Sequence, residues 1–194
     1  MGLKAGYCDL GFARVDTDRC RRKGFPEVIY CPGKAREHLK KIARALLKDK
    51  QDLLFTRLDK DAFAYLKKFS PRLKYNSLAR IGYFLHRRAA KKGLVAVISA
   101  GTADIPVAEE AAVTLEVMGN RVTRFFDVGV AGVHRLMRNL QAIKKARVIV
   151  VVAGMEGALA SLVSGLVSAP VVAVPTSCGY GASFGGLSAL LTML

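Results

Sequence analysis

Charged side chains are missing from the last part of this 194-residue chain, because no Asp, Glu, Lys, Arg or His follows Glu156. An uncharged stretch of this length could span a membrane. Pro170 and Pro175 interrupt it, however, and Gly, Ser and Thr recur every few positions from residue 157 to 186. These interruptions favour burial inside protein, so we expect no membrane partner. The first residues carry charges throughout, so we identify no secretory leader and expect a cytoplasmic location.

Closely spaced cysteines are also absent. Cys8, Cys20, Cys31 and Cys178 lie at least 11 positions apart, and they form no C-x-x-C pair or Cys/His cluster. A structural zinc site needs such a cluster, so the spacing argues against one. We expect reduced, mostly structural thiols, which suit a reducing compartment.

The chain has neither a G-x-G-x-x-G nor a G-x-x-x-x-G-K-[ST] motif. The usual dinucleotide fingerprint and the P-loop are therefore excluded, and we expect no nicotinamide redox cofactor. A zinc finger, an RNP-type aromatic motif and a heptad zipper are missing as well. Their absence argues against a nucleic-acid polymer as the partner.

Positive charge is concentrated in the first half. Residues 1–93 hold 24 Lys and Arg against 9 Asp and Glu, whereas residues 94–194 hold 7 against 6. The basic half predicts a phosphate-bearing partner, which could be a nucleotide or a nucleic acid. The change in composition also predicts two domains, residues 1–92 and 93–194, with HRRAAKKG at 86–93 as the boundary.

The first half is predicted to be a small basic α+β domain. FPEVIY at 25–30 and DLLFTRL at 52–58 are typical of short strands, and KAREHLKKIARALLKD between them predicts a helix. A short helix at 60–69 and a strand at 75–85 complete the domain. The first helix has apolar residues at the three-and-four spacing of one face, namely Leu39, Ile42, Ala43, Leu46 and Leu47.

The second half alternates strands with helices. Its apolar runs predict four strands, at residues 94–100, 121–128, 147–154 and 170–177. Each is followed within a few residues by a helical stretch, at 105–119, 130–145, 157–168 and from about Ser183 onward. Neighbouring parallel strands are joined by crossover connections, which are usually helices. This alternation therefore predicts an α/β fold with a parallel sheet covered on both faces.

In open sheets of this kind, ligands bind beyond the carboxyl ends of the strands. Those ends carry the segments SAGTAD, FDVGVAG, VAGMEGA and PTSCGYG, which are rich in glycine and small polar residues. One edge of the sheet is therefore predicted to be a ligand site, and the residues fit an enzyme with an anionic substrate.

Glu156 is the first candidate for chemistry at this edge. Glycines on both sides let the backbone approach a ligand closely. Glu156 also lies at the predicted start of a helix, where it could act as a cap. A cap does not need glycine on both sides, so we favour a functional acid, and we expect the apolar strands to enclose it.

Asp104 in AGTADIP repeats this arrangement one strand away, and Pro106 suits a first helical turn. An ordinary N-cap is an alternative explanation for Asp104. Two carboxylates on neighbouring loops could act as an acid and base pair, or could share a magnesium ion.

Hydroxyls and backbone amides of the same loops could hold the substrate. Arg135 suits a phosphate or a carboxylate, although a surface salt bridge is an alternative. The residues that we expect to bind substrate are Gly101, Thr102, His134, Arg135, Gly154, Met155, Gly157, Thr176, Ser177, Gly179, Tyr180 and Gly181.

At these loops the sequence resembles the carboxylase/hydrolase of nickel-pincer nucleotide cofactor biosynthesis, the LarB family, which serves lactate racemase. The similar segments are AGTADIPVAEEA, DVGVAGVHRL, VVAGMEGALASLVSGL and PVVAVPTSCGYGASFGGLSALLTML, together with DTDRCRRKGFPEVIY and FTRL in the basic half. The second half also resembles the carboxyaminoimidazole ribonucleotide mutases (PurE). This resemblance implies a three-layer, PurE- or flavodoxin-like α/β fold and a homo-oligomer of PurE type, an octamer.

The resemblance implies a reaction on nicotinate adenine dinucleotide, with magnesium as cofactor. The family carboxylates the pyridinium ring with carbon dioxide and cleaves the phosphoanhydride to release AMP. A pyridinium carbon attacks carbon dioxide only after a thiolate has added to the ring, and a base then removes the ring proton. By resemblance, Glu156 is this acid/base and Asp104 positions the ring or stabilises charge.

This sequence departs from the family's pattern at the residue that would supply the thiolate. The family's nucleophilic cysteine follows the last helix in an N-S-C stretch, which would lie beyond Leu194. We expect activity to depend on whether the protein continues to that cysteine. Cys178 occupies the variable position of PTS-x-GYG and is a weaker candidate for the thiolate.

Two other functions stay open at this point. A purine-pathway carboxyaminoimidazole ribonucleotide mutase would need that family's histidine-bearing loop, whereas this chain has only His38, His86 and His134. A non-catalytic nucleotide- or nucleic-acid-binding protein would fit the basic half.

Overall fold

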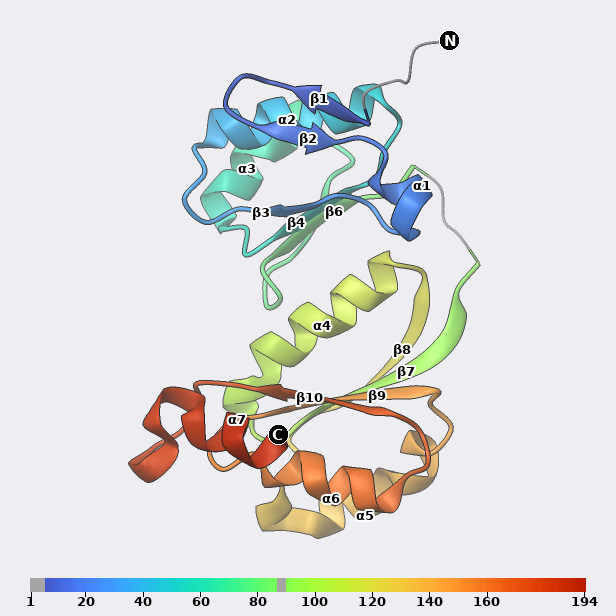
Figure 1. The fold of residues 1–194 in the computed structure, drawn as a ribbon, viewed down its shortest axis with the longest axis vertical. Helices are drawn as coiled ribbons and strands as arrows, with labels where there is room; N and C mark the ends of the chain where they lie inside the picture. The colour runs from blue at the N-terminus through green and yellow to red at the C-terminus, as the bar shows by residue number, and fades with distance from the viewer. Residues whose placement is uncertain (1–5, 87–89) are drawn as a thin grey trace. The chain divides into compact units, whose positions relative to one another are not determined.

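The computed structural model describes residues 6–86 and 90–194, which fall into two compact units divided between Ala89 and Ala90 (Figure 1). Part of the predicted boundary, residues 87–89, lies outside the described residues. Among the described residues, no helix is long and apolar enough to cross a membrane.

The N-terminal unit is a small α+β structure with two sheets. Its elements are β1 (Tyr7–Asp9), β2 (Arg14–Asp16), α1 (Arg19–Lys23), β3 (Val28–Tyr30), α2 (Arg36–Lys48), β4 (Leu53–Thr56), α3 (Lys60–Phe69), β5 (Lys74–Asn76) and β6 (Ile81–Phe84). Strands β1 and β2 form an antiparallel hairpin. The larger sheet has the order β3-β4-β6-β5, in which β3 and β4 are parallel and the other neighbours are antiparallel.

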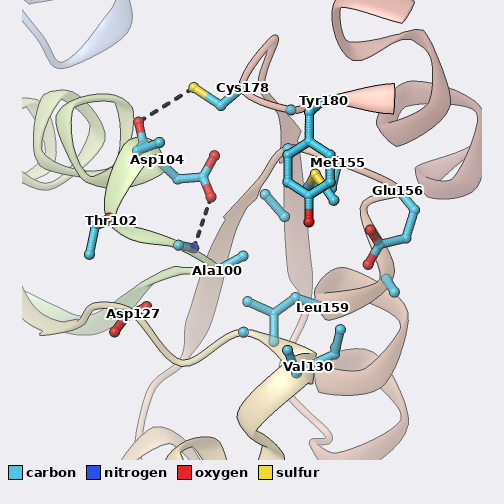
Figure 2. Close-up of a pocket in the computed structure, with 18 of the residues that line it drawn as sticks. Ala100, Thr102, Asp104, Asp127, Val130, Met155, Glu156, Leu159, Cys178 and Tyr180 are labelled. Atoms are coloured by element: carbon cyan, nitrogen blue, oxygen red, sulfur yellow. Dashed lines mark hydrogen bonds between the residues drawn. The ribbon is translucent and has the colours of Figure 1, made fainter. Parts of the chain in front are cut away.

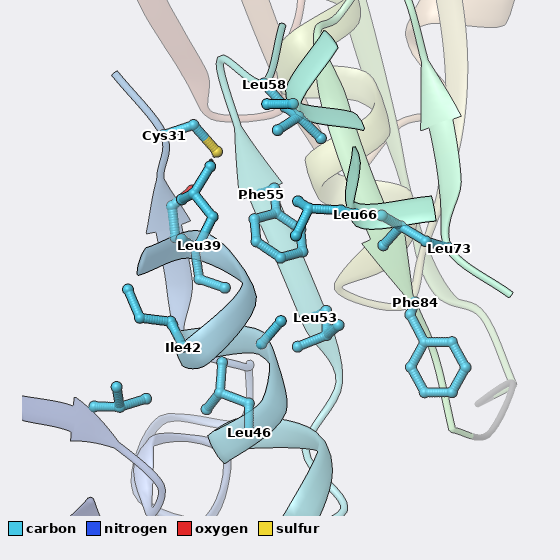
Figure 3. Close-up of a cluster of buried hydrophobic side chains, with 14 residues drawn as sticks. Cys31, Leu39, Ile42, Leu46, Leu53, Phe55, Leu58, Leu66, Leu73 and Phe84 are labelled. Atoms are coloured by element: carbon cyan, nitrogen blue, oxygen red, sulfur yellow. Dashed lines mark hydrogen bonds between the residues drawn. The ribbon is translucent and has the colours of Figure 1, made fainter. Parts of the chain in front are cut away.

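Helix α2 buries the apolar face that its sequence predicts. Four residues of this face are buried, namely Leu39, Ile42, Ala43 and Leu46, whereas Leu47 is partly buried. They pack against Leu53 and Phe55 of β4 (Figure 3). Cys31 belongs to the same core, and burial raises the pKa of its thiol to about 12, as suits a structural cysteine.

The predicted strand at 75–85 is wrong as a single element, because the structure has a hairpin of β5 and β6 there. The turn between them is stabilised by the Asn76 side chain, whose Oδ1 accepts the Ala79 N–H at 2.9 Å. Arg80 takes a left-handed backbone conformation, with φ of 51°. Asparagine competes for backbone hydrogen bonds in this way and thereby favours turns over strands.

The C-terminal unit has the α/β architecture that the alternating sequence predicts. Its elements are β7 (Lys92–Ser99), α4 (Ile105–Val117), β8 (Asn120–Phe125), α5 (Val133–Ile143), β9 (Val148–Ala153), α6 (Ala158–Leu166), β10 (Val171–Pro175) and α7 (Leu187–Met193), with short 3₁₀ turns at Thr102–Asp104, Val130–Gly132 and Gly181–Gly186. All neighbouring strands are parallel, in the order β10-β9-β7-β8.

Alternate residues of the strands build two separate apolar layers. Val95 and Val97 of β7 pack with Ala108 and Ala112 of α4 on one face of the sheet. The intervening Ala96 packs on the opposite face with residues of α5 and α6, and Figure 1 shows these helices on the two sides of the sheet. The three-layer, PurE-like α/β fold is therefore confirmed.

The last helix begins later than predicted. A 3₁₀ turn occupies Gly181–Gly186, and the α-helix starts at Leu187 rather than near Ser183. Phe184 and Gly186 within this turn have φ values of 46° and 101°, which interrupt a regular helix.

An ion-paired cluster joins β8 to α4. Arg124 donates to both oxygens of Glu109, at 2.7 and 3.1 Å, and to both oxygens of Glu116, at 2.8 and 3.2 Å. We predict that Arg124→Ala lowers the free energy of unfolding by about 3 kcal/mol, because it removes the guanidinium that the buried Glu109 and the partly buried Glu116 share. Arg138→Ala, at an exposed position of α5, serves as control and should change stability by about 0.5 kcal/mol or less. Urea unfolding of both variants measures this, and equal losses would contradict the prediction.

The same cluster predicts an acid-dependent loss of stability. The hydrogen bonds from Arg124 hold the pKa of Glu116 below its ordinary value of 4.5. The unfolded chain therefore takes up this proton at a higher pH than the folded chain, so the stabilisation is complete above pH 4.5 and is lost as pH falls through the folded pKa. The difference in stability between wild type and Glu116→Gln should shrink below that pH. A difference that stays constant from neutral pH to pH 3 would contradict this.

Candidate active site

A cavity of about 550 Å³ lies at the carboxyl edge of the parallel sheet (Figure 2). Residues after all four strands line it, from the segments 100–104, 127–135, 153–159 and 178–180. The sheet's switch point lies between β7 and β9, since the helices that follow them, α4 and α6, cover opposite faces. Ligands of open α/β sheets bind at such points, and the volume suits a small molecule.

Asp104 is held firmly in the loop after β7. Asp104 is 4% exposed, and each of its carboxylate oxygens accepts a hydrogen bond. The Gly101 N–H donates to Oδ2 at 2.9 Å, and the Thr176 hydroxyl donates to Oδ1 at 2.7 Å. The first bond closes the turn Gly101–Asp104, whereas the Asp104 side chain caps no N–H of α4, so the structure does not support the ordinary N-cap alternative. The second bond joins the loop after β7 to the loop after β10.

We predict that Thr176→Val destabilises the protein by about 1–3 kcal/mol, because a buried carboxylate oxygen loses its donor. Thr192→Val is the matched control, since the Thr192 hydroxyl only donates to the Ser188 carbonyl on an exposed face. The control should change stability by about 0.5 kcal/mol or less. Thermal unfolding of the two variants tests the difference, and a Thr176 variant as stable as wild type would contradict it.

Glu156 is at the rim of the cavity, across from Asp104 in Figure 2. Its side chain is exposed, so the expected enclosure by apolar strands is wrong for this chain. Among the described residues, it accepts no hydrogen bond, and α6 begins after Gly157 without a side-chain cap. The geometry therefore gives no support to a helix-cap role and leaves both carboxylate oxygens available to a ligand.

The loops after β9 and β10 are in direct backbone contact. The Met155 N–H donates to the Cys178 carbonyl at 2.8 Å. A Cβ at Gly154 would lie 1.9 Å from the same carbonyl oxygen, so only glycine fits there. Met155 has a φ of 53°, an uncommon left-handed conformation for a residue other than glycine, and such strain gathers at functional sites.

Asp127 is a site residue that the sequence analysis missed. Its φ is 57°, and its N–H donates to the Ser99 hydroxyl at 3.1 Å. Its Oδ2 accepts a hydrogen bond from Arg135 Nη1 at 2.6 Å. The salt-bridge alternative for Arg135 is thus correct, and the pair still lines the cavity. Asp127 lies two residues after the end of β8, in the segment FDVGVAG, and the strand-end argument that selected Asp104 could have selected it.

The cavity brings together most of the predicted site residues. The predicted residues that line it are Gly101, Thr102, Asp104, Arg135, Gly154, Met155, Glu156, Gly179 and Tyr180. The others lie outside its lining, namely His134, Gly157, Thr176, Ser177 and Gly181. Thr176 reaches the site through Asp104, and Gly157 supplies the turn before α6 with a φ of 73°.

His134 is exposed on α5 and does not face the cavity with Arg135. Successive helical residues point about 100° apart, and this rotation turns His134 away from the cavity that Arg135 lines. Ser177 is exposed while Thr176 is buried, because successive residues of extended chain point to opposite sides.

The described part of the chain contains no group of three or more His, Cys, Asp or Glu residues that could hold a metal ion. Both oxygens of Asp104 and one oxygen of Asp127 are already engaged. Magnesium is usually held by one or two carboxylates together with phosphate groups of the substrate, so the magnesium implied by resemblance stays a prediction.

Comparison with known families agrees with this geometry. Residues 7–87 match the LarB/PurE-like N-terminal domain, and residues 94–194 match AIR carboxylase. The chain belongs to the LarB family. It is thereby a member of a PurE-related carboxylase/mutase family. An uncharacterized protein of Methanocaldococcus jannaschii is 37% identical to this LarB-family chain over 195 residues, which cover 93% of the chain and 73% of the relative.

Proposed function

We propose that this LarB-family chain carboxylates the pyridinium ring of nicotinate adenine dinucleotide and hydrolyses its phosphoanhydride, which releases AMP. The observation that carries the proposal is the cavity at the carboxyl edge, where an exposed Glu156 faces a fixed Asp104 and an Arg135–Asp127 pair. The carboxylates of the lining suit the cationic pyridinium ring, and the Arg135 guanidinium, which Asp127 holds in place, is the group suited to an anionic part of the dinucleotide.

The two carboxylates have different surroundings and therefore suit different roles. Glu156 is exposed at the rim and accepts no hydrogen bond among the described residues, so it is available to take the ring proton. Asp104 is buried and already accepts two hydrogen bonds, so it suits positioning of the ring rather than proton transfer.

The carboxylation needs a nucleophile to activate the ring. Addition of a thiolate to the pyridinium gives a neutral dihydropyridine, whose enamine carbon attacks carbon dioxide. Glu156 then removes the proton from that carbon, and the thiolate leaves as the aromatic ring is restored. In our proposal the thiol is the cysteine that the family carries after its last helix. Cys178 is the second candidate, because it lines the cavity with its Sγ 3.4 Å from the Ala103 carbonyl oxygen.

The test is incubation of the full gene product with nicotinate adenine dinucleotide, ¹³C-bicarbonate and magnesium, followed by mass spectrometry. We expect a mononucleotide that carries one labelled carboxylate, together with AMP. A parallel reaction with EDTA tests the need for magnesium. Unchanged dinucleotide after incubation with the full gene product would overturn the proposed function.

A second candidate is the carboxyaminoimidazole ribonucleotide mutase reaction, which is favoured by the match of residues 94–194 to AIR carboxylase. The match of residues 7–87 to the LarB/PurE-like N-terminal domain favours the first proposal. Parallel assays with carboxyaminoimidazole ribonucleotide and nicotinate adenine dinucleotide discriminate the two. Turnover of the imidazole substrate alone would establish the second candidate.

We also propose that the chain forms a homo-oligomer of PurE type, an octamer. Large apolar side chains are exposed on the C-terminal unit, among them Phe184 at 75%, Leu191 at 64% and Leu187 at 49%. Exposed apolar clusters mark association surfaces. Light scattering during gel filtration measures the mass, and a monomer at all concentrations would contradict this proposal.

A further inference from the structure

A second cavity, of about 230 Å³, lies within the N-terminal unit at the β5–β6 hairpin. The cavity is lined by six residues. Arg72 precedes β5 and Lys74 lies in it, Tyr83 and Phe84 lie in β6, and Leu85 and His86 follow β6. Three of these six side chains are basic, and none is acidic. The cavity therefore offers positive charge and hydrogen-bond donors on an apolar base.

The aromatic ring of Phe84 fixes two of the donors. The guanidinium carbon of Arg72 lies 4.9 Å from the centre of the ring, and the His86 imidazole meets the ring edge-on with centroids 4.8 Å apart. Phe84 itself is 7% exposed and belongs to the buried cluster drawn in Figure 3. A guanidinium that lies over an aromatic ring keeps its N–H edge free for a bidentate partner.

The backbone beneath these donors is anchored. Leu73, between Arg72 and Lys74, is 1% exposed in the core, and Lys74 pairs with Tyr83 in the antiparallel ladder. The His86 N–H donates to Asp52 Oδ1 at 2.7 Å, which fixes the far end of the hairpin. Asp52 is a nearby acid, and the structure does not place it in the lining of the cavity.

The basic side chains of this cavity are not neutralised by acids. Within residues 6–86 and 90–194, neither Arg72 nor Lys74 forms a salt bridge, although ten other ion pairs occur there between Arg and acidic residues. Two uncompensated cations and an imidazole around one small cavity form the donor set that a phosphate dianion needs. The volume lies below the usual range for whole small-molecule ligands, so it suits one phosphate group.

We propose that this cavity binds the phosphate group of a small phosphate monoester, such as a mononucleotide, through Arg72, Lys74 and His86. The proposal goes beyond the carboxylation chemistry, because every residue that it uses belongs to the N-terminal unit. It can therefore fail or succeed independently of the proposed function.

The three histidines of the chain provide site-specific probes for the test. His86 lines the cavity, His38 stacks on Phe12 elsewhere in the same unit, and His134 lies on α5 of the other unit. Their ring signals are followed by ¹H–¹³C NMR at constant pH while inorganic phosphate, AMP or adenosine is added to the full chain. We expect saturable shifts at His86 with phosphate and AMP, and no shift there with adenosine.

A pair of double variants matched in charge completes the test. R72Q/K74Q should weaken the response of His86 to phosphate by about tenfold or more. K48Q/K68Q removes two exposed lysines from α2 and α3 and should leave the response unchanged. Equal shifts at all three histidines, no saturation at His86, or equal weakening by both variants would overturn the proposal. Tighter binding of single-stranded RNA with a steep salt dependence would also overturn it, since that behaviour belongs to a nucleic-acid surface.

Discussion

Glu156→Gln is expected to slow carboxylation by about 10²–10⁴-fold, the usual contribution of a general acid/base. The amide keeps the size of the side chain but cannot take a ring proton. Glu156 is exposed and makes no hydrogen bond among the described residues, so the substitution should leave folding and dinucleotide binding intact. Single-turnover formation of the labelled carboxylate, measured by mass spectrometry, gives the rate of the chemical step.

The control for this prediction is Asp49→Asn, which removes one exposed carboxylate after α2 and should keep the wild-type rate. Binding is measured separately by calorimetry with nicotinate adenine dinucleotide. A Glu156 variant that binds and carboxylates like wild type would remove this residue from the mechanism. A variant that no longer binds would make it a binding residue instead.

Gly154→Ala should destabilise the protein by about 3 kcal/mol, at the upper end of overpacking effects. The new Cβ would lie 1.9 Å from the Cys178 carbonyl oxygen and 2.7 Å from the Thr176 hydroxyl oxygen. Neither atom is the end of a flexible chain, so the loops after β9 and β10 must separate. This movement should also break the hydrogen bond from the Met155 N–H to the Cys178 carbonyl.

Gly165→Ala is the matched control within the same unit. Gly165 lies in α6, and a Cβ there meets nothing within 4 Å. Alanine should stabilise this helix by about 0.5–1 kcal/mol, because it restricts the unfolded chain and favours helix. Urea unfolding should therefore move in opposite directions for the two variants. Two shifts of the same sign and size would show that the contact at Gly154 does not constrain the loops.

The fold of the C-terminal unit was predictable because its signals are local. Each strand is an apolar run, and each crossover helix follows within a few residues, so order and layers follow from general rules of parallel sheets. The same rules located the cavity, since the four strand ends converge at one edge. The hairpin of β5 and β6 was missed because its turn depends on one side chain, Asn76, whose Oδ1 bonds to a backbone N–H three residues on.

The details of the candidate site depended on contacts that are distant in sequence. The hydrogen bond between Thr176 and Asp104 joins residues 72 positions apart, and no pattern of local residue spacing predicts such a contact. Side-chain direction was the other source of error. His134 was predicted to bind substrate because it is next to Arg135 in the sequence, but the rotation of the helix points the two side chains in different directions. Glu156 was expected to be enclosed because its neighbours are apolar, yet its turn carries it outward to the rim.

The hydrogen bond from Thr176 to Asp104 joins loops whose strands, β10 and β7, are not neighbours in the sheet, because β9 lies between them. Together with the bond from the Met155 N–H to the Cys178 carbonyl, it links the loops after β7, β9 and β10, which form three walls of the cavity. A ligand enters a preorganised cavity and loses little affinity to the ordering of these loops. The wall from residues 127–135 after β8 and the outward rim at Glu156 and Tyr180 lie outside this linkage, so we expect any adjustment to a ligand to occur there.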